Sequence, residues 1–375
     1  MSKNTNKKGL SAFGIASTYV GAIIGAGYAS GQEILQFFNA FHEKGLISII
    51  IATFLFIVAA YIPMMLGRRL KTDDYESILS FGKTKLPRTF SDIVITFTLF
   101  STLTIMIAAS GATFGQTMGW PLIVGGIIMC VLLMVSLLAG LDGIVKALSA
   151  VVPVMVIGAF ATAIYFTVNP VAVDSTKEIV VNSSPLIKHW SLSGILYVTF
   201  NYVVAIGVMV TMGNKAKDQK AIKNGAVFGG LTLGVCAFAL YTALSKNLGL
   251  IGTSNLPIVD LVNTISPLVG SLYSIVLFAG LYSTAISCFF GVYQRANKIS
   301  VFKKLGNKAT IASITLVALA ASMLGFTNLI GYVYPAIGYC AVAILIMNII
   351  TYTKTEDIPE LEAEKEEYVT QEDYN

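Results

Sequence analysis

Four glycines interrupt the first apolar segment of the chain, which reads VGAIIGAGYASGQE from residue 20. They are Gly21, Gly25, Gly27 and Gly31. Each glycine inside a helix costs up to about 1 kcal/mol relative to alanine, so helix stability does not explain them. A helix interrupted at this point would offer N–H groups to a substrate carboxylate and carbonyl groups to a cation. Alternatively, their four-residue spacing permits close helix packing. We expect the interrupted helix.

Glu33 is the only acidic residue that lies inside a predicted membrane span and away from its ends. An unpaired carboxylate in the hydrocarbon region costs about 2.5 kcal/mol or more, so Glu33 should face the protein interior or a water-filled path. There it could carry a proton, close an outer gate or pair with a substrate amine. The other interpretation places it near the outer end of a tilted helix, where its side chain reaches water.

Half a chain later, residues 199–207 read TFNYVVAIG and place Asn201, Tyr202 and Gly207 in the middle of an apolar span. Five crossings separate this span from the first, so it enters the membrane from the opposite side, as an inverted repeat requires. We therefore expect a second break here, lined by substrate-binding residues. A hydrogen bond from Asn201 to another helix is the alternative.

The eighth span contains AGLYSTAIS, in which Gly280, Ser283 and Thr284 share one helix face. Two hydroxyls, together with carbonyl groups freed by a broken helix, would provide several oxygen ligands for a hard cation. The alternative is that both hydroxyls donate to carbonyls one turn earlier in their own helix.

The elements that position these residues are membrane helices. The 375-residue chain is 55% hydrophobic and only 12% charged, with a mean hydropathy of +0.75. That composition excludes a soluble domain, and the scattered Lys and Arg residues exclude nucleic-acid binding. Apolar runs of about 20 residues predict ten spans. After the first span they lie in 45–67, 93–141 (two), 147–173, 190–214, 224–245, 261–294 and 309–353 (two).

The loop charges indicate the orientation. With ten spans, 21 of the 25 Lys and Arg residues fall on the side of the N-terminus, which is the cytoplasmic side. We expect one transmembrane domain over residues 1–353 of a cytoplasmic-membrane protein, with repeats at about 10–170 and 190–352 and both termini in the cytoplasm. Residues 354–375 hold 9 of the 20 acidic residues and predict a disordered tail. Residues 72–82 predict a short capped helix on the cytoplasmic face. In the outer loop at 248–267, Asn255, Leu256 and Pro257 favour the start of another short helix, and this loop could form a lid.

Enzymatic and metal-centre chemistry is poorly supported. The four cysteines are far apart, and the two histidines, His42 and His189, lie near predicted helix ends without a catalytic partner in the apolar core. We therefore expect a protein that is not an enzyme and has no resident cofactor.

The ten spans, the glycine-rich segment, the polar break expected in the sixth span and the YST of the eighth together resemble the amino acid-polyamine-organocation (APC) superfamily with its LeuT-type fold. The GAGYASGQE run is most similar to the bacterial YkvI-type membrane proteins. The superfamily likeness covers residues 10–352. It implies an all-α polytopic membrane protein with a 5+5 inverted repeat, in which the first and sixth helices are broken.

The resemblance also implies site residues. A Na+ site would use the carbonyls of Gly21, Ile24 and Gly280 with the hydroxyls of Ser283 and Thr284. The carboxylate-binding turn corresponds to Gly25, Ala26 and Gly27, and the contact from the sixth helix to Phe200, Asn201 and Tyr202. Tyr28 stands where a second Na+ site of the family has Asn, so that second site is not expected.

These observations predict a secondary transporter that moves a small organic solute, an amino acid or a related compound, together with Na+. Alternating access would come from rocking of helices 1, 2, 6 and 7 against the rest, as the resemblance implies. Proton coupling through Glu33 is the nearest alternative. A sensor or receptor that binds a small molecule on the same fold is the second.

Overall fold

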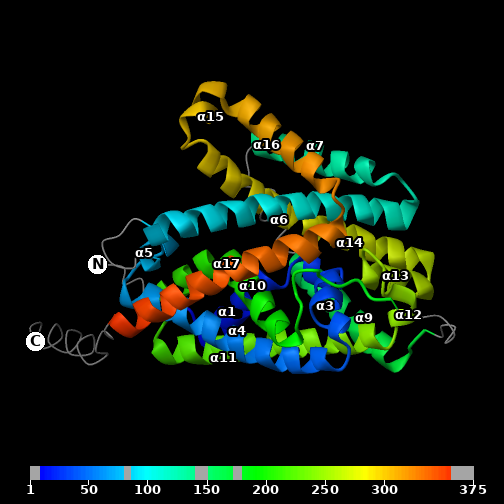
Figure 1. Cartoon of the computed structure of the whole chain (residues 1–375), viewed down its shortest axis with the longest axis horizontal. Coiled ribbons are helices and arrows are strands. Elements are labelled where there is room, and N and C mark those ends of the chain that lie inside the picture. The colour runs from blue at the N-terminus through cyan, green and yellow to red at the C-terminus, as the bar shows by residue number, and fades with distance from the viewer. Residues whose placement is uncertain (1–8, 80–85, 140–150, 172–179, 356–375) are drawn as a thin grey trace, which may run out of the picture.

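The computed structural model describes residues 9–79, 86–139, 151–171 and 180–355. This part of the chain is a set of helices that run mostly along one axis of the molecule (Figure 1). Six of the described helices are long and apolar enough to cross a membrane. They are α4 (Lys44–Arg69), α6 (Leu86–Met118), α10 (Trp190–Asn214), α11 (Gln219–Ser245), α14 (Pro267–Ala296) and α17 (Phe326–Lys354). Four shorter apolar helices accompany them: α1 (Ala12–Ile23), α7 (Leu122–Ala139), α9 (Val151–Val168) and α16 (Asn307–Ser322). The chain is therefore a multi-pass membrane protein.

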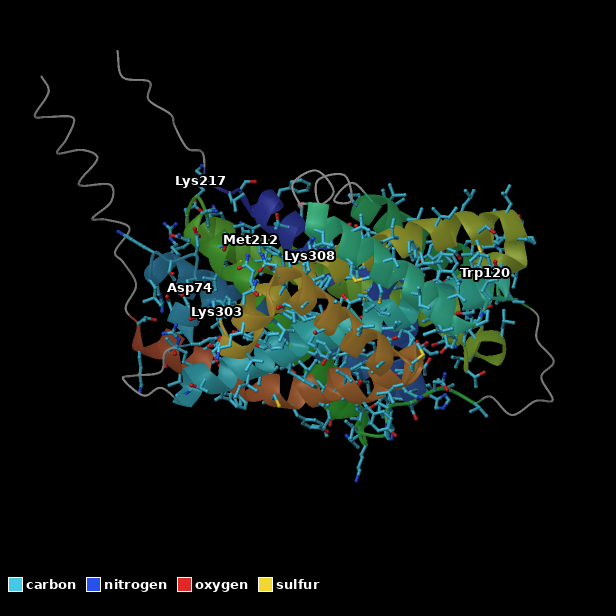
Figure 2. All side chains as sticks on the ribbon, turned by 90° about the horizontal axis from the view of Figure 1, so that it is seen from above. Asp74, Trp120, Met212, Lys217, Lys303 and Lys308 are labelled. Carbon is cyan, nitrogen blue, oxygen red and sulfur yellow. The ribbon has the colours of Figure 1, made fainter. Side chains whose placement is uncertain are left out.

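The two ends of this bundle differ in character. The short helices α5 (Tyr75–Ile78) and α15 (Ser300–Leu305) lie toward one end, whereas α12 (Leu248–Ile251) and α13 (Pro257–Ile265) lie at the other (Figure 1). Figure 2 places Lys217 and Lys303 toward the first end and Trp120 near the second. The basic loops thus gather at one end, which we call the basic end; the opposite one is the α13 end.

The first helix is broken, as its glycines predict. Helix α1 stops at Ile23, a short helix α2 (Ala26–Ala29) follows, and α3 (Gln32–Phe37) completes the segment before the 3-10 helix η1 (Asn39–Phe41). Gly31 joins α2 to α3 with φ of +81°, a conformation that glycine adopts without strain. A Cβ at this position would also lie 2.9 Å from the side chain of Ile258. The chain therefore needs glycine here for two independent reasons.

The expected break in the sixth helix is wrong, because α10 is continuous from Trp190 to Asn214. Asn201 donates its amide N–H to the carbonyl of Tyr197 one turn earlier, at 2.8 Å, so its polar group is satisfied within the helix. Gly207 is the only glycine near the middle, and one glycine is tolerated in a helix at about 1 kcal/mol. No backbone group is freed here, in contrast to the first helix.

The span expected at 261–294 also differs from the structure. Pro267 begins α14 after Ser266, whose side chain accepts from the N–H groups of Leu268 and Val269 and so caps the helix. The preceding residues belong to α13 instead, which starts at Pro257, a favoured residue in the first helical turn. The expected short helix in the outer loop is thereby confirmed.

The helices form two packing groups (Figure 1). The first, called the bundle group, consists of α1, α4, α10 and α11; the second, the scaffold group, consists of α6, α7, α14 and α16. Helices α9 and α17 contact both groups. Within the bundle group, Gly67 and Gly213 bring α4 and α10 so close that a Cβ on either glycine would collide with a carbonyl of the other helix. Leu10 pairs with Lys215 and Lys217, which ties the start of α1 to the loop after α10.

The acidic tail at 356–375 lies outside the described residues, so its expected disorder stays a prediction. The short helix expected at residues 72–82 is described only up to residue 79. There, Asp74 caps α5 by accepting from the N–H of Glu76.

Candidate functional site

The break between α1 and α2 leaves particular carbonyl groups without backbone partners. The N–H of Gly25 turns back to the carbonyl of Ile23, at 2.8 Å, instead of bonding to Gly21. Among the described residues, the carbonyls of Gly21 and Ile24 accept no backbone hydrogen bond across the break. Other carbonyls of the segment do find partners: Tyr273 donates to Ala29 at 2.7 Å, and Ser30 donates to Gly27 at 2.7 Å. The carbonyls of Gly21 and Ile24, which are among the groups left without a backbone partner, are those that the resemblance assigns to a cation.

Helix α14 passes directly beside this break. A Cβ on Gly25 would lie 3.9 Å from the hydroxyl oxygen of Thr284. Thr284 also donates to the carbonyl of Gly280 at 3.2 Å, as Ser and Thr commonly do in membrane helices. The structure thus brings Gly25, Gly280 and Thr284 together. Gly21, by contrast, lies on an exposed face of α1 with nothing within 4 Å of its Cβ position, so the predicted Na+ ligands are only partly gathered.

Glu33 is buried in the protein, with 5% of its surface exposed. The interpretation in which it reaches water at a helix end is therefore wrong. Its carboxylate lies against the break, because a Cβ added to Gly27 would collide with the carboxylate. Tyr197 of α10 donates its hydroxyl to this carboxylate at 3.3 Å. Within the described part of the chain, no Lys, Arg or His side chain forms an ion pair with Glu33.

Aromatic rings from three helices gather beside Glu33. The ring of Tyr197 lies 5.3 Å from that of Phe37 and 5.5 Å from that of Phe200, measured between centroids. Phe200 in turn stacks on Tyr334 of α17 at 4.3 Å. All four rings are almost completely buried. Such rings present negatively charged faces, so this set and the carboxylate together suit a positively charged group.

Only one of the three residues expected from the sixth helix belongs to this cluster. Phe200 lies in it, whereas Asn201 bonds to its own helix and Tyr202 accepts a hydrogen bond from Asn348 of α17. Sequence reasoning missed Tyr197 and Tyr334. Tyr197 stands three residues before Phe200, on the same helix face, so the helical spacing could have indicated it. No comparable signal distinguishes Tyr334 in the sequence.

Helix α13 covers the site at its own end of the bundle. The N–H of Ile258 donates to the carbonyl of Ser30 at 3.1 Å, which joins α13 to the first helix. Asp260 accepts from Gln116 of α6 at 2.8 Å and from Ser254 at 2.6 Å. Burial raises the pKa of Asp260, although both hydrogen bonds oppose this change. Residues 27–39 are buried throughout, so the α13 end is closed over the site.

Gln32 and Gln36 add a polar contact to this closure. Both side chains donate to Thr327 at the start of α17, Gln32 to its hydroxyl at 3.2 Å and Gln36 to its carbonyl at 2.8 Å. Thr327 donates in turn to Asn255 in the loop before α13, at 2.7 Å. Helix α3, the start of α17 and the loop before α13, which are distant in the sequence, are thereby joined at the α13 end of the site.

Helix α1, the half of the first helix that lies toward the basic end, has an exposed face. Helix α1 packs on α10 and α11, but Thr18 and Gly21 are exposed on its other face. A cavity of about 390 Å³ lies between Thr18 of α1 and Val208 and Thr211 of α10. The described structure is thus closed at the α13 end, whereas toward the basic end α1 presents an exposed face beside this cavity.

No protein-family model matches this chain. Two Bacillus subtilis (strain 168) proteins are similar to it over most of their length. The uncharacterized membrane protein YkvI is 26% identical over 337 residues, which cover 89% of this chain and 94% of YkvI. The uncharacterized protein YyaD is 26% identical over 342 residues, which cover 89% and 96%. The resemblance to YkvI-type membrane proteins is thus confirmed.

Solved transporter structures share the fold. The inward-facing conformation of Mhp1 has a TM-score of 0.63 and 14% identity, covering 91% of this chain and 76% of Mhp1. MhsT in complex with L-phenylalanine gives 0.56 and 14%, covering 92% and 88%. A Na+-coupled sialic acid symporter gives 0.55 and 14%, covering 92% and 79%. These likenesses confirm the predicted LeuT-type fold. The matched proteins are transporters rather than enzymes, in agreement with the expectation of a protein that is not an enzyme.

Proposed function

We propose that this protein is a secondary active transporter in which a small organic solute binds at the break of the first helix. The observation that carries the proposal is the asymmetry around that break. The site is closed by α13 and the two glutamines at one end, whereas toward the other end α1 presents an exposed face beside the cavity at Thr18. A protein that alternates between two such states moves a solute across the membrane, whereas a channel needs a continuous path.

The ten apolar helices each cross the cytoplasmic membrane in this proposal, as a 5+5 inverted repeat with both termini in the cytoplasm. The distribution of Lys and Arg supports this orientation. The basic end is then cytoplasmic, and the described state is inward-facing. The bundle group and the scaffold group are the two bodies that rock against each other, and the pairing of Leu10 with Lys215 and Lys217 makes α1 move with α10.

Na+ is the proposed coupling ion. A hard cation requires oxygen ligands, and the orphaned carbonyls of Gly21 and Ile24 can provide two of them. The hydroxyl of Thr284 lies beside Gly25 and can provide a third. Because Gly21 is exposed here, the ligand set is completed only when α1 approaches α14. Na+ binding would then favour closure of the cytoplasmic side, which is how an ion gradient drives alternating access.

The test of Na+ coupling is uptake of a labelled amino-acid pool into proteoliposomes under an inward Na+ gradient, beside a choline control. Ser283→Ala/Thr284→Ala should raise the half-saturating Na+ concentration at least about tenfold, because it removes two ligands worth about 0.5–1.5 kcal/mol each. Ser287→Ala, an exposed hydroxyl one turn further along α14, is the matched control and should leave it unchanged. Uptake that is equal in Na+ and choline would contradict Na+ coupling.

The solute is proposed to be an amino acid or a related amine, because Glu33 lacks a basic partner among the described residues and lies beside aromatic faces. A substrate ammonium group would supply the missing positive charge. In the alternative mechanism, a proton from solution supplies it, and Glu33 carries that proton across.

The inward-facing state predicts a pattern of thiol accessibility. In a Cys340→Ser background, in which the remaining cysteines are buried, Thr18→Cys should react with a membrane-impermeant thiol reagent from the cytoplasmic side. Gln32→Cys should not react when the same reagent is applied from the extracellular side, because Gln32 is completely buried. Ile15→Cys, on the packed face of α1, is the matched control for Thr18 and should stay unlabelled. Rapid labelling of Gln32→Cys with protection of Thr18→Cys would show an outward-facing resting state instead.

A further inference from the structure

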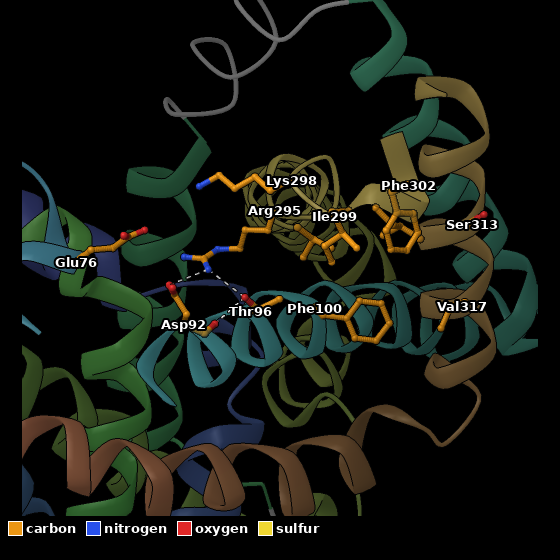
Figure 3. A pocket seen from close by; sticks show the side chains of 13 residues that line it. Glu76, Asp92, Thr96, Phe100, Arg295, Lys298, Ile299, Phe302, Ser313 and Val317 are labelled. Atoms are coloured by element: carbon orange, nitrogen blue, oxygen red, sulfur yellow. Dashed lines mark hydrogen bonds and ion pairs between the residues drawn. The ribbon is translucent and has the colours of Figure 1, made fainter. Parts of the chain in front are cut away.

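A separate cavity opens on the flank of the scaffold group, between α6, α14, α15 and α16 (Figure 3). Its volume is about 440 Å³. Arg295 and Lys298 line one end of it together with Asp92, whereas Phe100, Phe302 and Val317 line the other (Figure 3). The cavity therefore has a charged end and an apolar end, as the binding site of an amphiphile does.

The depth of the two ends matches the two parts of a membrane lipid. Arg295 lies in the last turn of α14, at the basic end of the molecule. Phe100 follows Asp92 by eight residues in α6, which corresponds to about 12 Å at 1.5 Å per residue. Along α6, Phe100 thus lies about 12 Å further from the basic end than Asp92, whereas Phe302 belongs to α15 at the basic end itself. Val317 and Ile299 are 57% and 52% exposed, so the cavity opens sideways, toward lipid.

At the charged end, one cationic side chain, that of Lys298, is available to bind an external anion. Asp92 pairs with Arg295 at 3.3 Å, and Glu76, the other acid at this end, pairs with Arg88. Arg295 also donates to Thr96 at 3.0 Å and to the hydroxyl of Tyr75. In the part of the chain that the structure describes, the side chain of Lys298 forms no hydrogen bond or ion pair.

The segment around this end is strongly basic. Residues 295–308 contain five Lys or Arg residues and no acidic residue. Lys303 and Lys304 stand in the last turn of α15, directly beside the cavity wall formed by Phe302. Clusters of basic residues on the cytoplasmic side of membrane helices attract anionic lipid headgroups.

We propose that this cavity binds an anionic phospholipid. The phosphate lies at Lys298, supported by the remaining N–H groups of Arg295, and one acyl chain runs between α6 and α16 along Phe100 and Val317. A phospholipid without net charge fits the apolar end but adds no net negative charge to compensate the positive charge of Lys298. Free phosphate fits the charged end but leaves the apolar end empty. The inference uses the cytoplasmic orientation of the proposed function and does not depend on what is transported.

The test titrates the purified full-length protein in detergent with dioleoylphosphatidylglycerol, dioleoylphosphatidylcholine or inorganic phosphate, and counts retained lipid by native mass spectrometry. The tightest-bound phosphatidylglycerol should be retained about fivefold more strongly than phosphatidylcholine. Lys298→Gln should abolish this preference. Lys223→Gln, the same charge change at an exposed position at the start of α11, should preserve it.

A second variant tests the apolar end separately. Val317→Trp fills the space between α6 and α16 without changing any charge, and its partly exposed position tolerates a larger side chain. It should weaken retention of both lipids at least threefold, with an unchanged melting temperature. Equal retention of the two lipids by the wild type, equal behaviour of Lys298→Gln and Lys223→Gln, or displacement of phosphatidylglycerol by phosphate alone would overturn the proposal. Because the readout is lipid retention, failure of transport would leave it unaffected.

Discussion

Glu33→Gln is expected to lower uptake of an amine-bearing solute about 100-fold while the protein stays folded. Glutamine has the size of glutamate and can still accept from the hydroxyl of Tyr197, so the local packing is retained. It lacks the negative charge that compensates the substrate ammonium group. Removing one partner of a buried charge pair costs about 2–5 kcal/mol, and 2.7 kcal/mol corresponds to a hundredfold change in binding.

The measurement is uptake into proteoliposomes over a series of pH values, with and without Na+. Three results are distinguishable. Loss of uptake at every pH supports pairing of Glu33 with the substrate. Retained uptake with its pH effect lost and its Na+ dependence intact supports a proton-carrying Glu33. Full uptake with an unchanged pH profile contradicts both roles. Glu43→Gln makes the same change at an exposed position and should behave as wild type.

Gly27→Ala is expected to reduce uptake more than tenfold, because its Cβ would occupy the place of the Glu33 carboxylate. The carboxylate must move, or α2 must shift against α14, and overpacking of this kind typically costs about 1–3 kcal/mol. The displaced acid would lose its contact with Tyr197 and its position over the break. Uptake and the melting temperature of the purified variant are the two measurements.

Gly14→Ala is the matched control for Gly27→Ala. It adds the same methyl group to the first helix, but the nearest atoms, the hydroxyl oxygen of Ser11 and a methyl carbon of Leu10, lie at 3.6 and 3.7 Å, which is ordinary van der Waals contact. Gly14 belongs to neither the proposed cation site nor the break. We expect a normal melting temperature and less than a threefold change in uptake. If both glycine variants transport equally well, the contact between Gly27 and Glu33 has no part in transport.

The break in the first helix was predictable because its cause is local. Glycines cluster within a few residues there, and each lowers helix stability without help from the rest of the fold. The sixth helix shows the limit of the same reasoning. Asn201 looked like a polar interruption, yet its side chain bonds to the carbonyl of Tyr197 and the helix continues. A polar residue in a span has several possible partners, and the sequence does not rank them.

The position of Glu33 illustrates the same distinction. Its presence in an apolar span predicts a carboxylate that faces the protein interior or a water-filled path, because an unpaired charge in lipid is costly. Its surroundings were not predictable. Tyr197 lies 164 residues away in the chain, and no local sequence pattern indicates that Tyr334 belongs to the same cluster. Gly31 is a further case, because its tight contact with Ile258 of α13 depends on how the outer loop folds back.

The sequence by itself determined the membrane class, the approximate spans and the interruption of the first helix. Hydrophobic length and glycine content act over short stretches of chain, so these features need no knowledge of neighbouring helices. Only the tertiary structure decided that the sixth helix is continuous, that Glu33 lies over the break beside Tyr197 and Phe200, and that the site is closed by α13. These depend on which helices meet and at what depth, because the energies of packing and of buried polar groups belong to contacts between distant segments.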